Sequence, residues 1–158
     1  MTIGIGADVS ATYATLKEGK TPAVGDVYDG ADGKSYKFVL FNNGAGSVAA
    51  VAGSVGFYFG ASGTATAASA YTVTGDATDS IGLGAGVFQS VPADGEYCWV
   101  QIKGPATLTT ALTSGADGNA LCAGAADLTL KVSAAVTDSV VASAVDASAD
   151  IISCNFPR

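Results

Sequence analysis

The sequence predicts an all-β chain: a single compact β-barrel or β-sandwich, jelly-roll-like, of short antiparallel strands with an extended N-terminal arm. Runs of β-forming residues such as KSYKFVLF and EYCWVQIK alternate with turn-forming Gly, Asp and Ser. Only 13% of residues are charged, about half the usual ~25%, which disfavours helices with charged outer faces. Ala-Asp-Gly recurs at 31–33, 93–95 and 116–118, and Asp-Gly suits hairpin turns that need positive φ.

Residues 1–24 are predicted to form the extended arm, and 25–158 to form the single β-rich domain. The segment MTIGIGADVSATYATLKEGKTPAV has no sustained period of 2 or 3.6, so it favours neither strand nor helix. Such an arm is either a loose terminus or a segment that orders on a neighbouring subunit.

The domain is predicted to contain a series of short strands. We expect them at Asp26–Tyr28, Ser35–Asn42, Gly56–Phe59, Ala70–Thr74, Gly86–Ser90, Tyr97–Lys103, Ala120–Ala123, Leu128–Val132 and Asp150–Phe156. The segment 137–149, TDSVVASAVDASA, is predicted to be loop or strand rather than helix, because Val and Ser are indifferent helix formers.

The charge balance excludes two classes of partner. The net charge is −7, with six Lys and one Arg, so the chain lacks the basic clusters that neutralise nucleic-acid phosphates or bind anionic membranes. Its apolar runs are short and broken by Gly, so none predicts a transmembrane helix. We therefore expect no nucleic-acid and no membrane partner.

The chain also lacks the residues that usually perform catalysis or bind metals. The chain contains no His, which removes the commonest base for activating Ser or Cys. Asp94 and Glu96 come nearest to the pair of carboxylates that a glycosidase needs. We interpret them instead as solvating a turn. Asp26, Asp29 and Asp32 fit no EF-hand register, so we interpret these residues too as turn-forming rather than as a looser calcium site. The sequence predicts no enzyme, no cofactor and no metal.

The cysteines Cys98, Cys122 and Cys154 are odd in number and widely spaced. No CxxC motif and no His accompany them, so no zinc site is indicated. We interpret them as buried free thiols that behave as small hydrophobic residues. A single disulfide with one free thiol is the alternative.

The strand EYCWVQIK carries the sole tryptophan. Period-2 alternation places Cys98, Val100 and Ile102 on one face, which is a core face by composition. Tyr97 and Trp99 share the other face with Gln and Lys. That face has three interpretations: an aromatic cluster covered by the chain's own loops, a subunit interface, or a carbohydrate-stacking platform.

Several motifs together resemble the small head decoration (cement) proteins of tailed bacteriophages. They are GLGAGVFQSVPADGEYCWVQIKGPATLTT with the later GADGNALCAG, the opening strand-turn-strand GDVYDGADGKSYKFVLFNNG, and the closing IISCNFP. The residues that match the family pattern are Gly95, Tyr97, Trp99, Val100, Gln101, Gly104, Gly118 and Leu121. The resemblance covers residues 25–158 in outline, and neither the arm nor the Ala/Gly/Ser-rich stretch 44–69 has a counterpart in it.

This resemblance implies a structural protein on the exterior of the virion, made in the host cytoplasm. Its partners would be the major capsid protein, whose neighbouring subunits it clamps, and itself, as a homotrimer. Tyr97 and Trp99 are then candidate subunit-interface residues. The alternative from the residues themselves is an extracellular carbohydrate-binding or adhesin β-module, and a third is a small-molecule-binding β-barrel.

Overall fold

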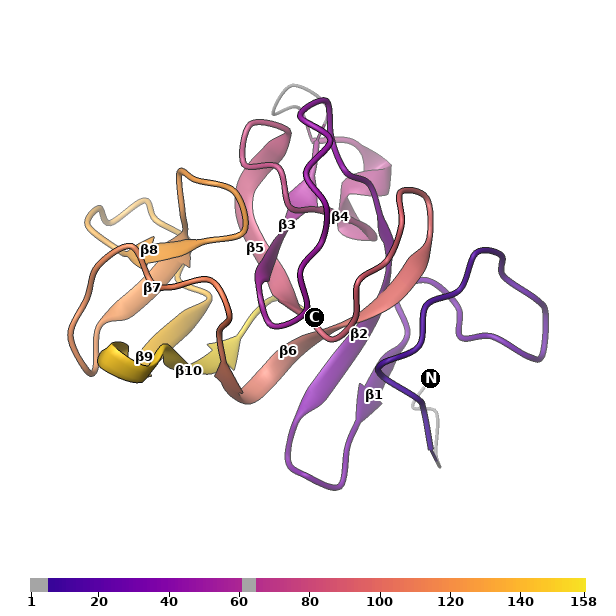
Figure 1. Ribbon diagram of the computed structural model, residues 1–158, viewed down its shortest axis with the longest axis horizontal. Helices are drawn as coiled ribbons and strands as arrows, with labels where there is room; N and C mark the ends of the chain where they lie inside the picture. Colours follow the sequence, from indigo (N-terminus) through magenta and orange to yellow (C-terminus); the bar gives the residue numbers. More distant parts are fainter. Residues whose placement is uncertain (1–5, 61–64) are drawn as a thin grey trace.

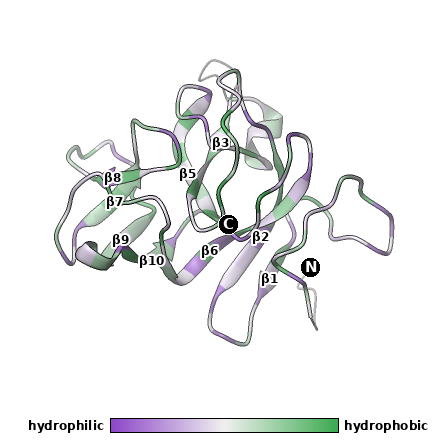
Figure 2. Ribbon diagram, in the orientation of Figure 1, coloured by the Kyte–Doolittle hydropathy of each residue, from purple (hydrophilic) through white to green (hydrophobic). Residues whose placement is uncertain are grey.

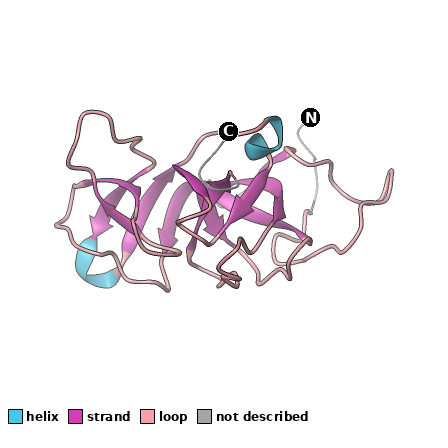
Figure 3. Ribbon diagram, turned by 90° about the horizontal axis from the view of Figure 1, so that it is seen from above, coloured by secondary structure: helices cyan, strands magenta, loops and turns pink. Residues whose placement is uncertain are grey.

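The computed structural model describes residues 6–60 and 65–158, and in these residues nearly all regular structure is β (Figure 1). The strands are β1 (Val27–Asp29), β2 (Ser35–Phe41), β3 (Val55–Phe59), β4 (Thr72–Thr74), β5 (Ser80–Phe88), β6 (Tyr97–Thr107), β7 (Ala120–Ala123), β8 (Leu130–Val132), β9 (Ala142–Asp146) and β10 (Ile151–Asn155). Among the described residues, two 3-10 helices, η2 (Ala67–Ala70) and η3 (Ala147–Ala149), lie at the periphery (Figure 3). The predicted all-β class is confirmed.

Every strand expected from the sequence is present, with two boundaries that differ clearly. Strand β6 continues to Thr107 rather than ending at Lys103. Strand β5 begins at Ser80 rather than at Gly86, although its first half, SIGLG, is rich in glycine. Gly84 makes room for a ring, since a Cβ there would lie 2.9 Å from the Phe156 ring, and Gly82 has a φ of 76° that favours glycine. The strand therefore needs glycine where a sequence pattern takes glycine as a strand breaker.

Strand β9 occupies the segment 137–149 that the sequence left as loop or strand. Its buried residues are smaller than its exposed apolar residue, which is the opposite of the usual pattern. Ala142 and Ala144 are buried, whereas Val145 is 53% exposed. Small residues point inward here and the larger one points outward, so hydrophobicity alone gives no clear period.

The strands form one sheet in the order β1-β2-β4-β3-β5-β6-β10-β9-β7-β8, and an additional β2–β6 pairing closes part of it. The closed ring consists of β2, β4, β3, β5 and β6, so the central part is a barrel. The pairings are antiparallel as expected, except that β2 and β4 run parallel.

Strand β6 connects this barrel to the rest of the sheet. Its first part pairs with β2, from Leu40↔Tyr97 to Ser35↔Lys103, and its second part pairs with β10, from Asn155↔Lys103 to Ile151↔Thr107. The remaining strands β9, β7 and β8 continue outward from β10 as a second lobe (Figure 1). The long strand β6 is thus shared by the barrel and the second lobe.

The three Ala-Asp-Gly segments form turns as predicted. Their glycines, Gly33, Gly95 and Gly118, have φ of 78°, 80° and 83°, in the left-handed region that favours glycine. The main hydrophobic core is formed mostly by buried side chains of the strands, and green segments mark β5, β7 and β8 in Figure 2.

The N-terminal arm has no helix or strand from residue 6 to residue 24, in keeping with its aperiodic sequence. It is nevertheless attached to the domain, because Tyr13 forms an isolated β-bridge with Tyr97. The two backbone hydrogen bonds of this bridge measure 2.9 Å and 2.8 Å. The arm therefore lies along β6 of its own chain.

Candidate functional site

Strand β6 has the core face that the sequence predicted. Cys98 and Val100 are 0% exposed and Ile102 is 1% exposed, and all three belong to the main core. This part of the interpretation is confirmed.

The opposite face of β6 is buried at its centre. Trp99 is 0% exposed and Gln101 is 2% exposed, whereas Tyr97 is partly buried and Lys103 is exposed. The burial of Trp99 agrees with the first of the three interpretations, an aromatic cluster covered by the chain's own loops. The Gln101 amide donates to the Lys103 and Pro105 carbonyls of its own strand, so its N–H donors have acceptors without water.

Trp99 lies in a second, aromatic cluster covered by the chain itself. Its ring centroid is 5.1 Å from that of Phe38 and 6.3 Å from that of Tyr28. Tyr13 of the arm adds an edge-on contact with Phe38 at 5.6 Å, and Val9 packs against the same cluster. Of the three interpretations of this face, the structure places Trp99 under its own chain, where it offers no surface to a sugar or a second subunit.

The candidate carboxylates serve turns. Asp94 accepts the Asn43 backbone N–H, and Glu96 accepts the Ala93 backbone N–H. These bonds hold the turn that precedes β6, in keeping with its interpretation as a solvated turn.

The three aspartates at 26, 29 and 32 point to separate partners. Asp26 accepts the Ala23 N–H, Asp29 accepts the Ser35 hydroxyl, and Asp32 accepts the Tyr36 hydroxyl. Among the described residues no group of three or more His, Cys, Asp or Glu is arranged to hold a metal ion.

The three cysteines are free and buried, as interpreted from the sequence. Burial raises the pKa of Cys98 to about 12 and that of Cys154 to about 12, and it also raises the pKa of Cys122. Because the thiolate is the nucleophile, these groups are poor nucleophiles at neutral pH.

A polar site that the sequence interpretation missed surrounds Lys37 on β2. Lys37 is 5% exposed, and period-2 alternation puts it on the same face as Val39 and Phe41 of the main core. A lysine at a core position of an alternating strand was the available signal. Lysine is almost never fully buried unless it is paired.

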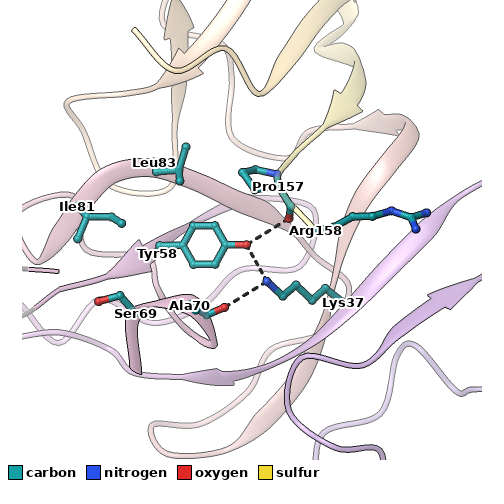
Figure 4. Close-up of a pocket in the computed structure, with 8 residues that line it drawn as sticks. All are labelled: Lys37, Tyr58, Ser69, Ala70, Ile81, Leu83, Pro157 and Arg158. Atoms are coloured by element: carbon teal, nitrogen blue, oxygen red, sulfur yellow. Dashed lines mark hydrogen bonds between the residues drawn. The ribbon is translucent and has the colours of Figure 1, made fainter. Parts of the chain in front are cut away.

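The partners of the Lys37 ammonium are neutral oxygens (Figure 4). Its Nζ donates to the Tyr58 hydroxyl at 3.1 Å and to the Ala70 carbonyl at 3.1 Å. Tyr58 in turn donates to the Pro157 carbonyl at 3.2 Å. Lys37 thereby connects β2 with β3, with η2 and, through Tyr58, with the C-terminal segment.

The electrostatic surroundings of Lys37 are unusual because no carboxylate of the described residues lies within ion-pair distance of it. The rings of Tyr58 and Tyr71 lie 5.1 Å and 5.7 Å from Nζ, which gives partial compensation through cation–π attraction. Burial lowers the pKa of Lys37 and raises the pKa of Tyr58 to about 12.

A cavity of about 310 Å³ lies against this pair of side chains. Its walls are mostly apolar, formed by Ile81 and Leu83 of β5 together with Ala70 and Pro157. Arg158 also lines it, but the guanidinium points away from Lys37 in Figure 4 and pairs with Asp29 at 3.3 Å. The arrangement is an apolar hollow with one buried cation.

Comparison with known proteins gave no match: no family model matches the chain, and no curated protein or solved structure is significantly similar to it. Within the described residues, no helix is long and apolar enough to cross a membrane.

Proposed function

We propose that this chain is a structural, non-enzymatic protein of a tailed-bacteriophage virion. It binds the outer surface of the capsid, clamps neighbouring subunits of the major capsid protein, and associates with itself as a homotrimer. The proposal rests first on the resemblance of residues 25–158 to head decoration proteins.

The observation that carries the proposal furthest is where the resembling residues lie. Tyr97, Trp99, Val100, Gln101 and Gly104 all belong to β6, the strand that joins the barrel to the second lobe. Gly104 has a φ of 91°, and a Cβ there would lie 3.1 Å from the Gly33 carbonyl oxygen. The residues of the resemblance thus lie on the strand that joins the two parts of the sheet, which supports a resemblance at the level of the fold.

The surface supports a binding role. It carries few charges, and several large apolar side chains are exposed, among them Leu16 at 41%, Val91 at 62% and Val136 at 105%. A standard protein interface buries ~1,200–2,000 Å² in total, and the chain has 7346 Å² of accessible surface. One chain therefore has room for both capsid and trimer contacts. Tyr97, which is partly buried, remains a proposed interface residue.

The alternative, an extracellular carbohydrate-binding or adhesin module, loses its main support at Trp99. A stacking platform needs an accessible ring face, and this ring is 0% exposed. We therefore rank the carbohydrate-binding or adhesin module below the capsid protein as a proposed function.

The test is sedimentation of the purified chain with capsids assembled from the major capsid protein encoded in the same genome. We expect the chain to sediment with the capsids in a saturable amount, and images of the particles to show it at sites of local symmetry. Val136→Lys and Leu16→Lys, both at exposed positions, test the second lobe and the arm as contact surfaces.

Two controls keep the result interpretable. The melting temperature of each variant establishes that lost binding is not lost folding, and sedimentation equilibrium of the free chain measures the trimer. A folded chain that stays in the supernatant at saturating concentration would overturn the proposal, and specific retention on a glycan array would then favour the alternative.

A further inference from the structure

The Lys37 pocket combines three features. Lys37 is 5% exposed, the two hydrogen-bond acceptors of its ammonium are neutral, and a cavity of about 310 Å³ lies against it. An ammonium has three N–H donors, so one has no acceptor among the described residues. A buried cation with a free donor attracts an anion more strongly than one in water does.

We propose that this pocket is a binding site for a small carboxylate that carries a short aliphatic tail. The carboxylate accepts the free N–H of Lys37, and the tail lies against Ile81, Leu83 and Pro157. The proposal is independent of the capsid role and requires no partner protein.

The donor set favours a carboxylate over a phosphate. Phosphate sites present several donors at once, from Arg clusters, helix N-termini or glycine-rich loops. Here a single ammonium faces the cavity, and the nearby Arg158 guanidinium is turned toward Asp29. One cation can neutralise one carboxylate, whereas a phosphate dianion would remain uncompensated.

The walls and the size favour an aliphatic tail. Ile81, Leu83, Ala70 and Pro157 present hydrocarbon, which binds methylene groups by excluding water. The cavity lies at the lower end of the ~300–1,000 Å³ typical of small-molecule sites. Hexanoate, with a charged head and a flexible chain, is therefore a suitable probe, and butanoate tests the contribution of tail length.

The experiment is isothermal titration of the full chain with hexanoate, with hexanol and inorganic phosphate as matched probes. We expect hexanoate to bind at least ten-fold more tightly than hexanol, and phosphate not to bind. K37M should weaken hexanoate binding at least ten-fold, whereas K103M, which removes an exposed strand lysine, should leave it unchanged. Equal binding of hexanol and hexanoate, or of K37M and the unchanged chain, would overturn the proposal.

A second measurement needs no variant and so does not depend on K37M folding. The Lys37 side-chain signals, followed by NMR as the pH is raised, report the pKa of the ammonium with and without saturating hexanoate. A bound carboxylate stabilises the charged form, so we expect the pKa to rise by at least about one unit, the equivalent of ten-fold tighter binding to the ammonium than to the amine. An unchanged pKa in a chain that binds hexanoate places the ligand elsewhere and contradicts the proposal.

Discussion

The two faces of the β2–β6 pair are both buried, but they are covered in different ways. On one face Val39, Cys98 and Val100 pack into the main core of the barrel. On the other face Phe38 and Trp99 form an aromatic cluster that is covered by the N-terminal arm. The same two strands thus have one side closed by the sheet itself and one closed by a segment without regular structure.

The difference shows that the exposed fraction of the side chains does not by itself measure the free energy needed to open a face to solvent. Strands enclose the main core through continuous ladders of hydrogen bonds, whereas the arm is joined to β6 by the Tyr13–Tyr97 bridge. A hollow of about 560 Å³, lined by Trp99, Tyr13 and other residues mainly of the arm, adjoins this cluster. Segments with few packing contacts open at lower free energy than the whole fold, so we expect the arm to open first.

The largest effect is expected on the core face. Val100→Asp places a carboxylate where the side chain is 0% exposed. Burying an unpaired charge should lower the free energy of unfolding by about 4 kcal/mol or more, and urea denaturation measures this.

Val91→Asp is the matched control, because Val91 is 62% exposed and the same charge there remains in water. It should change the free energy of unfolding by less than about 0.5 kcal/mol. A loss from Val100→Asp as small as that from Val91→Asp would show that the core face of β6 is assigned incorrectly.

A smaller effect is expected from opening the arm. Tyr13→Ala removes the ring that covers Phe38 and should cost about 1–3 kcal/mol. Because Trp99 is the sole tryptophan, its fluorescence reports on this face alone. We expect the emission to shift to longer wavelength and acrylamide quenching to increase while the chain stays folded.

Val100→Ala separates this effect from general destabilisation. It should lower the free energy of unfolding by a similar amount through a cavity in the main core, yet leave Trp99 as protected as before. If quenching increases equally in both variants, the arm is not the specific cover of Trp99.

The sequence was sufficient where local chemistry decides the structure. The three Asp-Gly turns follow from the φ that glycine tolerates, and the Cys98–Val100–Ile102 face follows from period 2. Strand β9 was left undecided because Ala142 and Ala144 point inward while Val145 points out.

The two buried sites depend on contacts between distant segments, which a single sequence does not specify. Nothing periodic in the arm indicates that Tyr13 pairs with Tyr97, so the sequence left open whether the chain's own loops, a second subunit or a sugar covers Trp99. Lys37 did carry a local signal, its place on the face of Val39 and Phe41. Its partners Tyr58 and Ala70 come from elements that the fold alone brings together.

The smallest effect concerns the thiols, and it tests whether the two faces open independently. Cys98 lies on the main-core face of β6, and burial raises its pKa to about 12, so at pH 8 it is protonated as well as inaccessible. We expect the folded chain to react very slowly with a thiol reagent such as 5,5′-dithiobis(2-nitrobenzoate). Tyr13→Ala should raise that rate by no more than its loss of global stability accounts for, even though it exposes Trp99, because the strands that enclose Cys98 do not depend on the arm. Mass spectrometry of the labelled chain identifies which cysteine reacts. Labelling of Cys98 in Tyr13→Ala that is faster than the measured loss of global stability accounts for would mean that the two faces open together and that the arm is part of one cooperative unit with the barrel.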